Sequence, residues 1–330
     1  MEEFLKSVPE AKKFCESIAA NIGDYALFSG EKFEKIVNGV LAASNTDEQG
    51  EIFPKEELEK LEKDYRIDPM WLDVEHNPLI HPIGRVVAAK LFHDSSTGHH
   101  FIAGVIGYYG IDSYRKFADV SIDLETMPPE SPPISEAIST GASMRLAINP
   151  FEIDDETCRE ILTTAPTYVD RETERRLRKS LDPITIATLV FIWPAGKFLE
   201  GFFSEPGKDL YQWLKAGLLK KLESSKSKVR LLGAELIHGE TTLEYYVDSS
   251  DFFRVDEAFE KLQEAIGLAI AIVEKLRPAR VFSVVALYSS SESKWQILYA
   301  STEHGVITDR PQAIDVSKYG GLSIAGSAGK

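Results

Sequence analysis

The chain has 330 residues, of which 43% are hydrophobic and 27% are charged, and its net charge is −15 at pH 7. This length predicts two domains, and the composition is that of a soluble globular protein. Phosphate groups attract positive charge, so the acidic surface argues against binding to nucleic acids or anionic membranes. We therefore expect a protein substrate or a protein partner.

Cysteine usage and the N-terminal sequence indicate a cytoplasmic protein. Cys15 and Cys158 are the two cysteines, and they are not spaced as a CxxC motif. A disulfide framework or a thiolate metal site is therefore not expected. The first residues, MEEFLKSVPEAKK, lack the basic start and apolar stretch of a signal peptide.

Residues 1–35 are predicted to form a helical lead-in that packs on the following domain, with an arm for self-association as the alternative. A strand is expected at 36–45, followed by the turn DEQGE. The segment KEELEKLEK places Leu58 and Leu61 three residues apart, as on one face of a helix. The two apolar stretches GRVVAAKLFHD and FIAGVIGYYG flank DSSTGHH, which predicts a β-hairpin.

The segment WLDVEH at 71–76 alternates apolar and polar residues and predicts a further strand. His76 ends this strand on its apolar face, just before Asn77-Pro78 interrupts the ladder. A histidine at that position is held firmly and can still reach a cleft. His76 is therefore the candidate for a general base.

The order strand, D-x-x-G-E, helix, strand, E-H-N-P and H-P-I-G-R-V resembles the N-terminal region of tailed-phage prohead proteases. These enzymes mature capsids and share the herpesvirus assemblin fold. The resemblance runs from Ile36 to about Ile153, under half of the chain. It implies a curved β-barrel with helices over 36–160, a serine endopeptidase or self-processing activity, and His76 as the base.

The resemblance also implies a nucleophilic serine on a strand that follows the histidine. The matching segment is Val120-Ser121-Ile122-Asp123, so Ser121 is the candidate nucleophile, activated by proton transfer to His76. Asp123 stands where the family has glycine, and this departure favours the alternative of a catalytically silent scaffold for protein binding or assembly. Other serines and two carboxylates remain open as rivals or as the third catalytic residue: Ser139, Ser143, Glu136 and Glu152.

Histidines concentrate in the same block, where five of the seven lie between His76 and His100. Imidazoles and carboxylates are ordinary ligands for zinc or iron. No spacing matches a zinc motif, and the pair His99-His100 lies in the expected hairpin tip, where solvent exposure explains it. We predict no metal and no cofactor.

The second half is predicted to contain a helical connector at 161–227, an α+β module at 228–318 and a flexible Gly/Ser-rich tail at 319–330. The apolar run Ile184–Phe203 is interrupted by Pro194 and Lys197. It falls short of the roughly 20 apolar residues that a bilayer requires, so we expect a buried helix or hinge and no stable membrane insertion. The module reads as ββαββ with a mostly antiparallel sheet. The fold class is α+β.

Overall fold

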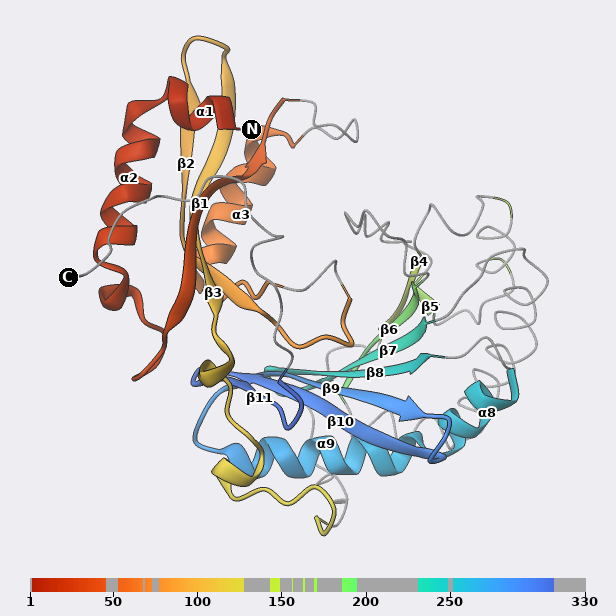
Figure 1. Cartoon of the computed structure of the whole chain (residues 1–330). Coiled ribbons are helices and arrows are strands. Elements are labelled where there is room, and N and C mark those ends of the chain that lie inside the picture. Colours follow the sequence, from red (N-terminus) through yellow and green to blue (C-terminus); the bar gives the residue numbers. More distant parts are fainter. Residues whose placement is uncertain are drawn as a thin grey trace. The chain divides into compact units, whose positions relative to one another are not determined.

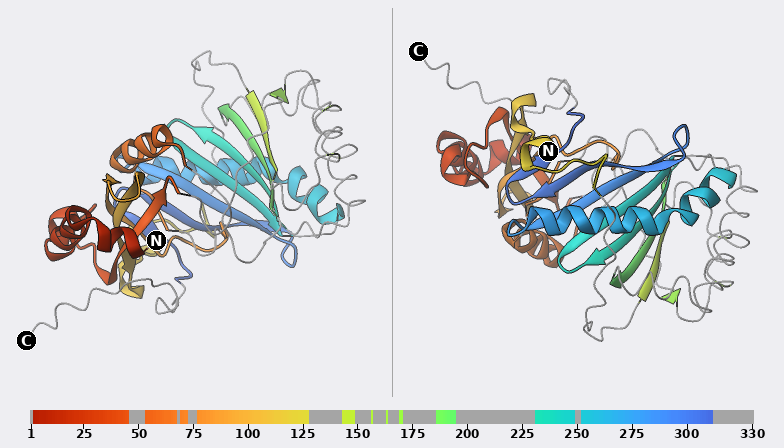
Figure 2. Two further views of the ribbon diagram at one scale, coloured as in Figure 1. Left: turned by 90° about the horizontal axis from the view of Figure 1, so that it is seen from above. Right: turned by 90° about the horizontal axis from the view of Figure 1, so that it is seen from below.

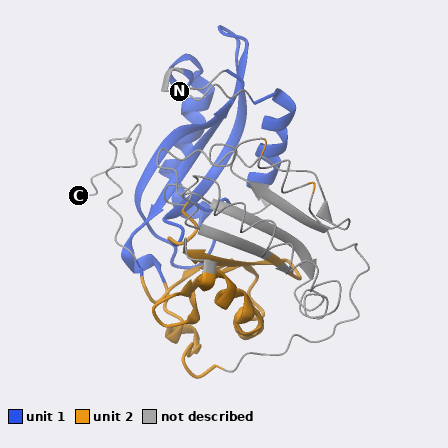
Figure 3. Ribbon diagram, turned by 90° about the vertical axis from the view of Figure 1, so that its right-hand side faces the viewer, with its two compact units in different colours: residues 1–74, 81–114, 311–330 blue, residues 75–80, 115–310 orange. Residues whose placement is uncertain are grey.

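The computed structural model of the chain describes residues 2–45, 53–67, 69–72, 77–127, 143–148, 169–170, 186–194, 231–248 and 252–311, together with Glu156 and Thr163 (Figure 1). The chain forms two compact units (Figure 3). Unit 1 comprises 1–74, 81–114 and 311–330, and unit 2 comprises 75–80 and 115–310. The division after Tyr114 precedes the domain boundary near 160 that we expected from the sequence.

Unit 1 is built on a three-stranded antiparallel sheet with the order β1-β3-β2. The strand expected at 36–45, the helix over KEELEKLEK and the hairpin are confirmed in this unit, and the strand expected at 71–76 falls mostly outside the described residues. Its elements are α1 (Glu2–Ser7), α2 (Pro9–Ala20), the 3-10 helix η1 (Ile22–Tyr25), β1 (Phe33–Ala43), α3 (Lys55–Ile67), β2 (Gly84–Asp94), β3 (His99–Tyr109) and η3 (Ile111–Ser113).

Helices cover both faces of this sheet (Figure 1). The buried positions Ala11, Cys15 and Ile18 of α2 pack against Phe101 and Val105 of β3. On the other face Leu58 of α3 packs against Ala42 and Ile102. The predicted helical lead-in is thus part of the core of unit 1, because its apolar positions recur at helical spacing.

Unit 2 contains a mixed eight-stranded sheet with the order β11-β10-β9-β8-β7-β6-β4-β5. Its elements are η4 (Ala118–Val120), β4 (Ser143–Ile148), β5 (Val169–Asp170), β6 (Ile186–Pro194), β7 (Leu231–His238), β8 (Thr241–Asp248), α8 (Phe252–Glu260), α9 (Leu262–Leu276), β9 (Val281–Ser289), β10 (Lys294–Thr302) and β11 (Gly305–Ile307).

The predicted ββαββ order is present, with the helical part divided into α8 and α9. The helix α9 runs across one face of the sheet (Figure 2). Ile266, Ala269 and Ile270 of α9 are fully buried. Most neighbouring strands of the sheet are antiparallel, as expected for the module, but β8 pairs with β9 in parallel, as do β6 with β7 and β4 with β5. The helices α8 and α9 carry the chain from the end of β8 back to the end of the sheet where β8 began. The strand β9 therefore runs parallel to β8.

The apolar run at 184–203 was expected to be a helix or hinge, and this prediction was wrong for the described part. Residues Ile186–Pro194 form β6, which lies between β4 and β7. A short apolar run rich in β-branched residues suits a strand that has neighbours on both sides. None of the helices in the described part of the chain has the length and apolarity needed to cross a bilayer.

The coarse prediction of a mixed α and β fold is confirmed. Within the described strands, neither sheet closes on itself, since β1 and β2 are the edges of the small sheet and β11 and β5 those of the large one. The curved barrel implied by the resemblance is therefore not seen in this part of the chain.

Candidate functional site

The candidate nucleophile Ser121 does not lie on a strand. It follows η4 and has a left-handed backbone with φ 59° and ψ 31°. Phe117 and Ile122, on either side of it, are buried in the core of unit 2. The resemblance implied a strand here, but Val120, Ile122 and Leu124 pack against the core from a compact turn.

The turn around Ser121 is held by aspartate side chains. Asp119 accepts a hydrogen bond from the backbone N–H of Lys116 at 2.8 Å. Asp123 accepts bonds from the N–H of Glu125 at 3.0 Å and the hydroxyl of Thr126 at 2.8 Å, and these bonds lower the pKa of Asp123. Asp123 therefore has a local structural role, as is usual for aspartate in turns.

The catalytic pair of His76 and Ser121 remains a prediction. His76 lies outside the described residues, as do Ser139, Glu136 and Glu152, and Ser143 is described only as the first backbone position of β4. Within the described part of the chain, no imidazole or carboxylate forms a hydrogen bond with the exposed side chain of Ser121.

The H-P-I-G-R-V segment is packed tightly inside unit 1. A Cβ on Gly84 would meet the carbonyl oxygen of Gly107 at 2.1 Å. Only glycine therefore fits at this position, where β2 lies very close to β3. His81 is buried, with its ring 4.3 Å from that of Tyr114. Burial lowers the pKa of His81, and its contact with the carbonyl of Pro82 partly opposes this.

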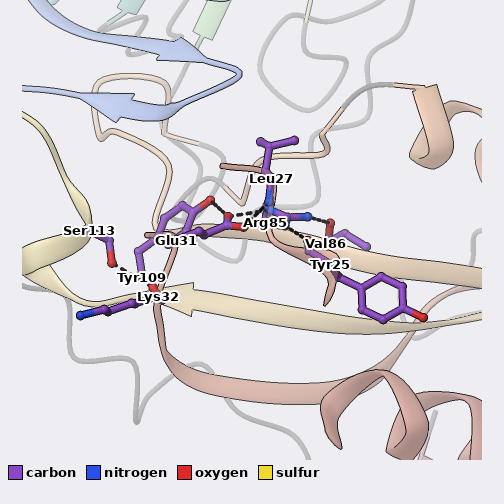
Figure 4. Close-up of polar contacts among 8 residues, drawn as sticks. All are labelled: Tyr25, Leu27, Glu31, Lys32, Arg85, Val86, Tyr109 and Ser113. Carbon is purple, nitrogen blue, oxygen red and sulfur yellow. Dashed lines mark hydrogen bonds and ion pairs between the residues drawn. The ribbon is translucent and has the colours of Figure 1, made fainter. Parts of the chain in front are cut away.

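Arg85 from the same segment forms a buried ion pair with Glu31, which lies just before β1 (Figure 4). The side chains are 5% and 0% exposed. The guanidinium donates from Nε to Glu31 Oε1 at 2.8 Å and from Nη2 to Oε2 at 2.7 Å. This two-point geometry is the strongest way in which arginine binds a carboxylate.

Further donors complete the coordination of the Glu31 carboxylate. The hydroxyl of Tyr109 donates to Oε1 at 2.6 Å, and the backbone N–H of Leu27 donates to Oε2 at 2.6 Å. Arg85 also donates to the carbonyl of Tyr25 at 2.6 Å. The network thereby fastens the 25–31 loop to β2 and β3 (Figure 4).

The pKa values in this network follow from burial and pairing. Burial raises the pKa of Tyr109 above its ordinary value, and the charge of Glu31 raises it further. Burial alone would lower the pKa of Arg85, but the hydrogen bond and charge of Glu31 raise it overall. Arg85 thus stays a cation and Tyr109 a neutral phenol, which suits a structural role rather than proton transfer.

Sequence reasoning missed Glu31 and Tyr109. Arg85 was identified only as part of the H-P-I-G-R-V motif, and Glu31 lies 54 residues before it in the chain. The one available signal was the general rule that a buried arginine needs an acidic partner.

A second polar cluster, also missed, lies on the helical side of unit 2. Glu257 of α8 accepts hydrogen bonds from Arg254 at 3.0 Å and from Lys261 at 3.2 Å. Burial acts to raise the pKa of Glu257, but these bonds bring it down to about 2. Lys261 also donates to the carbonyl of Ser293 at 2.6 Å and so ties the helices to the β9–β10 turn.

The histidines of the β2–β3 hairpin have different surroundings. His93 and His100 face each other with ring centroids 4.6 Å apart. The ring of His99 instead meets that of Phe4, at 6.4 Å. Among the described residues, no group of three or more histidine, cysteine, aspartate or glutamate side chains is arranged to hold a metal ion.

No known protein family, no characterised protein and no solved structure matches this chain.

Proposed function

We propose that this chain is a catalytically silent assembly module, similar in sequence to prohead proteases, that self-associates through the edge strand β1. One observation carries the proposal: β1 is an 11-residue strand that pairs with β3 on one side, and no described strand pairs with its other side. From Ile36 to Ala43 it carries no charged residue. Proteins usually protect such edges with charges, prolines or a covering segment.

The regular part of β1 is suited to pairing with another strand. Register shifts in its ladder with β3 fall between Phe33 and Lys35 and between Val40 and Ala42, so the stretch between them is uninterrupted. Asn38 lies at its centre, and its buried side-chain oxygen has no hydrogen-bond partner among the described residues.

A second copy of the chain fits this edge. Antiparallel pairing of two β1 strands about Asn38 places Ile36 opposite Val40 and Val37 opposite Gly39. β-branched pairs across strands are favourable. Lys35 then faces Leu41, and no like charges oppose each other. Such an interface is two-fold symmetric and closes after two copies.

The proposal that the chain is catalytically silent is also supported by the structural roles of the motif residues. Gly84 and Arg85, which carried much of the protease resemblance, serve packing and an ion pair inside unit 1. Ser121 lies in a turn of unit 2 with its side chain exposed.

Gly39 allows a direct test. A Cβ built on Gly39 meets no atom within 4 Å, so both alanine and lysine fit the protomer there. Size-exclusion chromatography with light scattering should find a dimer for the wild type and for Gly39→Ala. Gly39→Lys should be a monomer with an unchanged circular dichroism spectrum, because a charge on the edge disfavours pairing. A wild-type monomer at every concentration tested would overturn the proposal, as would a Gly39→Lys dimer.

A serine endopeptidase with Ser121 as nucleophile and His76 as base is the second candidate. It is favoured by the left-handed backbone of Ser121, since strained positions of this kind gather at active sites. A fluorophosphonate probe should then label the wild type, and neither Ser121→Ala nor His76→Ala. Ser293 has a similar backbone with φ 51°, so Ser293→Ala is the matched control and should keep the label. An unlabelled wild type would exclude this candidate.

A further inference from the structure

Two histidines face each other across the β2–β3 hairpin. His93 is the register partner of His100, and their ring centroids are 4.6 Å apart with an angle of 42° between the rings. His93 is exposed and His100 is half-buried. Solvent therefore reaches the pair while the strands fix its spacing.

The turn next to this pair is rigid. The N–H of Gly98 donates to the carbonyl of Asp94 at 2.7 Å, and the carboxylate of Asp94 accepts bonds from the N–H and the hydroxyl of Ser96. These bonds hold the register in which the imidazoles oppose each other. A site with fixed spacing loses less conformational entropy when it binds a ligand.

The first turns of α3 supply the charges near His100. Burial lowers the pKa of His100, and the neighbouring His93 and Lys55 lower it further, while Glu59 and Glu56 act in the opposite direction. Glu59 forms an exposed ion pair with Lys55 at 3.3 Å, and Glu56 adds a further carboxylate that favours the approach of a cation.

Metal coordination has a spacing that these rings can meet. Imidazole nitrogens bind first-row divalent metals at about 2.0–2.1 Å, so two nitrogens at a right angle on one ion lie about 3 Å apart. Rings whose centroids are 4.6 Å apart can present one nitrogen each at that separation. Right-angle coordination is preferred by Cu²⁺ and Ni²⁺, and Zn²⁺ prefers wider tetrahedral angles.

We propose that His93 and His100 form an exchangeable two-imidazole chelate for a divalent transition-metal ion, with Cu²⁺ and Ni²⁺ preferred over Zn²⁺ and water completing the coordination. The site is independent of the assembly function proposed above. A site with only two protein ligands binds reversibly, and this suits occupancy that follows the metal supply rather than a permanent structural ion.

The test is calorimetric titration of the full chain with CuCl₂, NiCl₂ and ZnCl₂ at pH 7.5. His93→Asn and His100→Asn should each weaken Cu²⁺ and Ni²⁺ binding about tenfold or more, because loss of a ligand costs at least as much as loss of its supporting contacts. His99→Asn is the matched control, since His99 is the neighbour of His100 and its ring packs against Phe4. This variant should keep its affinity within about twofold.

A second measurement locates the ion. Substoichiometric Cu²⁺ is paramagnetic and should broaden the ring-proton NMR signals of His93 and His100 before those of His99, His238 and His304. Equal affinities for all three variants would overturn the proposal. Broadening that first affects other histidines or the N-terminus would do the same, and so would tighter binding of Zn²⁺ than of Cu²⁺.

Discussion

Two buried tyrosines, one in each unit, show how differently the two cores treat a polar group. Tyr109 in unit 1 donates its hydroxyl to Glu31 at 2.6 Å. Tyr245 in unit 2 is 1% exposed, and its hydroxyl has no hydrogen-bond partner among the described residues. Its ring packs edge to face against Trp295 at 5.6 Å. Tyr109 thus belongs to a polar network, whereas Tyr245 contributes mainly as an aromatic ring.

The difference follows from how each unit is built. Unit 1 has three strands and must also hold the loop at 25–31, where Leu27 and Phe28 are only half-buried and Tyr25 is exposed. The fully paired Glu31 and Arg85 hold that loop in one position. Unit 2 buries the apolar helix α9 on a larger sheet, and there apolar burial is the main stabilising term. Buried charge specifies geometry in unit 1, and packing does so in unit 2.

The largest expected effect comes from breaking the buried ion pair. Glu31→Ala leaves the guanidinium of Arg85 buried without its carboxylate and should lower the free energy of unfolding by about 3–5 kcal/mol. Lys12→Ala, which removes the exposed pair with Glu16 in the same unit, should change it by well under about 1 kcal/mol. Hydrogen exchange should show the loss in β1–β3 and not in β8–β9. Equal exchange in both sheets would mean that the units do not unfold separately.

Two glycines of the same sheet provide the next contrast. A Cβ on Gly84 would lie 2.1 Å from a backbone oxygen, whereas one on Gly39 meets nothing within 4 Å. Gly84→Ala should therefore destabilise unit 1 by about 1–3 kcal/mol or more, because β2 and β3 must separate. Gly39→Ala should be nearly neutral. Chemical denaturation of the two variants measures the difference in their stability. Similar denaturation midpoints would contradict the inference that β2 and β3 lie too close for a side chain at Gly84.

The same substitution should lower the stability of the protein at Tyr109 but not at Tyr245. Tyr109→Phe removes a hydrogen bond to a charged group and should lower stability by about 1.5–3 kcal/mol. Tyr245→Phe removes a buried hydroxyl without a described partner and should be neutral or stabilising by about 1 kcal/mol. Thermal unfolding of the two variants, followed at two wavelengths, compares their stabilities. A destabilised Tyr245→Phe variant would indicate that its hydroxyl has a partner in the remainder of the chain.

The sequence predicted the elements whose signal is local. The hairpin of β2 and β3 was found because two apolar stretches flank a turn, and α3 because Leu58 and Leu61 have helical spacing. The apolar run that forms β6 was misassigned, since a short apolar run does not distinguish a buried helix from a buried strand. The turn at Ser121 was predicted to be a strand because the resemblance implied a nucleophile on a strand.

The contacts that define the candidate sites are long-range, and for this reason the sequence did not predict them. Nothing near Arg85 indicates that Glu31 is its partner, and the parallel pairing of β8 with β9 depends on a crossover that local periodicity does not encode. The pairing of His93 with His100 was within reach, because a symmetric hairpin about the turn at 95–98 places them opposite each other.

The smallest expected effect concerns two carboxylates that have similar pKa values for different reasons. The hydroxyl of Ser96 lowers the pKa of Asp94 in unit 1 to about 2 against the opposing effect of burial, and the hydroxyl of Ser7 contributes from α1 at 2.9 Å. In unit 2 the pKa of Glu257 is also about 2, where hydrogen bonds from Lys261 and Arg254 overcome burial. Asp94 is thus held by neutral hydroxyls and Glu257 by cations.

Both groups stabilise the folded state when they are ionised. A folded pKa below the ordinary value gives a contribution that is complete above that value and is lost as the pH falls through about 2. Asp94→Asn and Glu257→Gln should therefore each flatten the fall in stability between about pH 4 and pH 2. Added salt at about 1 M should reduce the Glu257 effect, because salt screens ion pairs, and leave the Asp94 effect nearly unchanged. Denaturation midpoints of the wild type and the two variants, measured across this pH range at low and high salt, separate the two causes. An Asp94 effect that disappears in salt would show that charge, and not the serine hydroxyls, holds this turn.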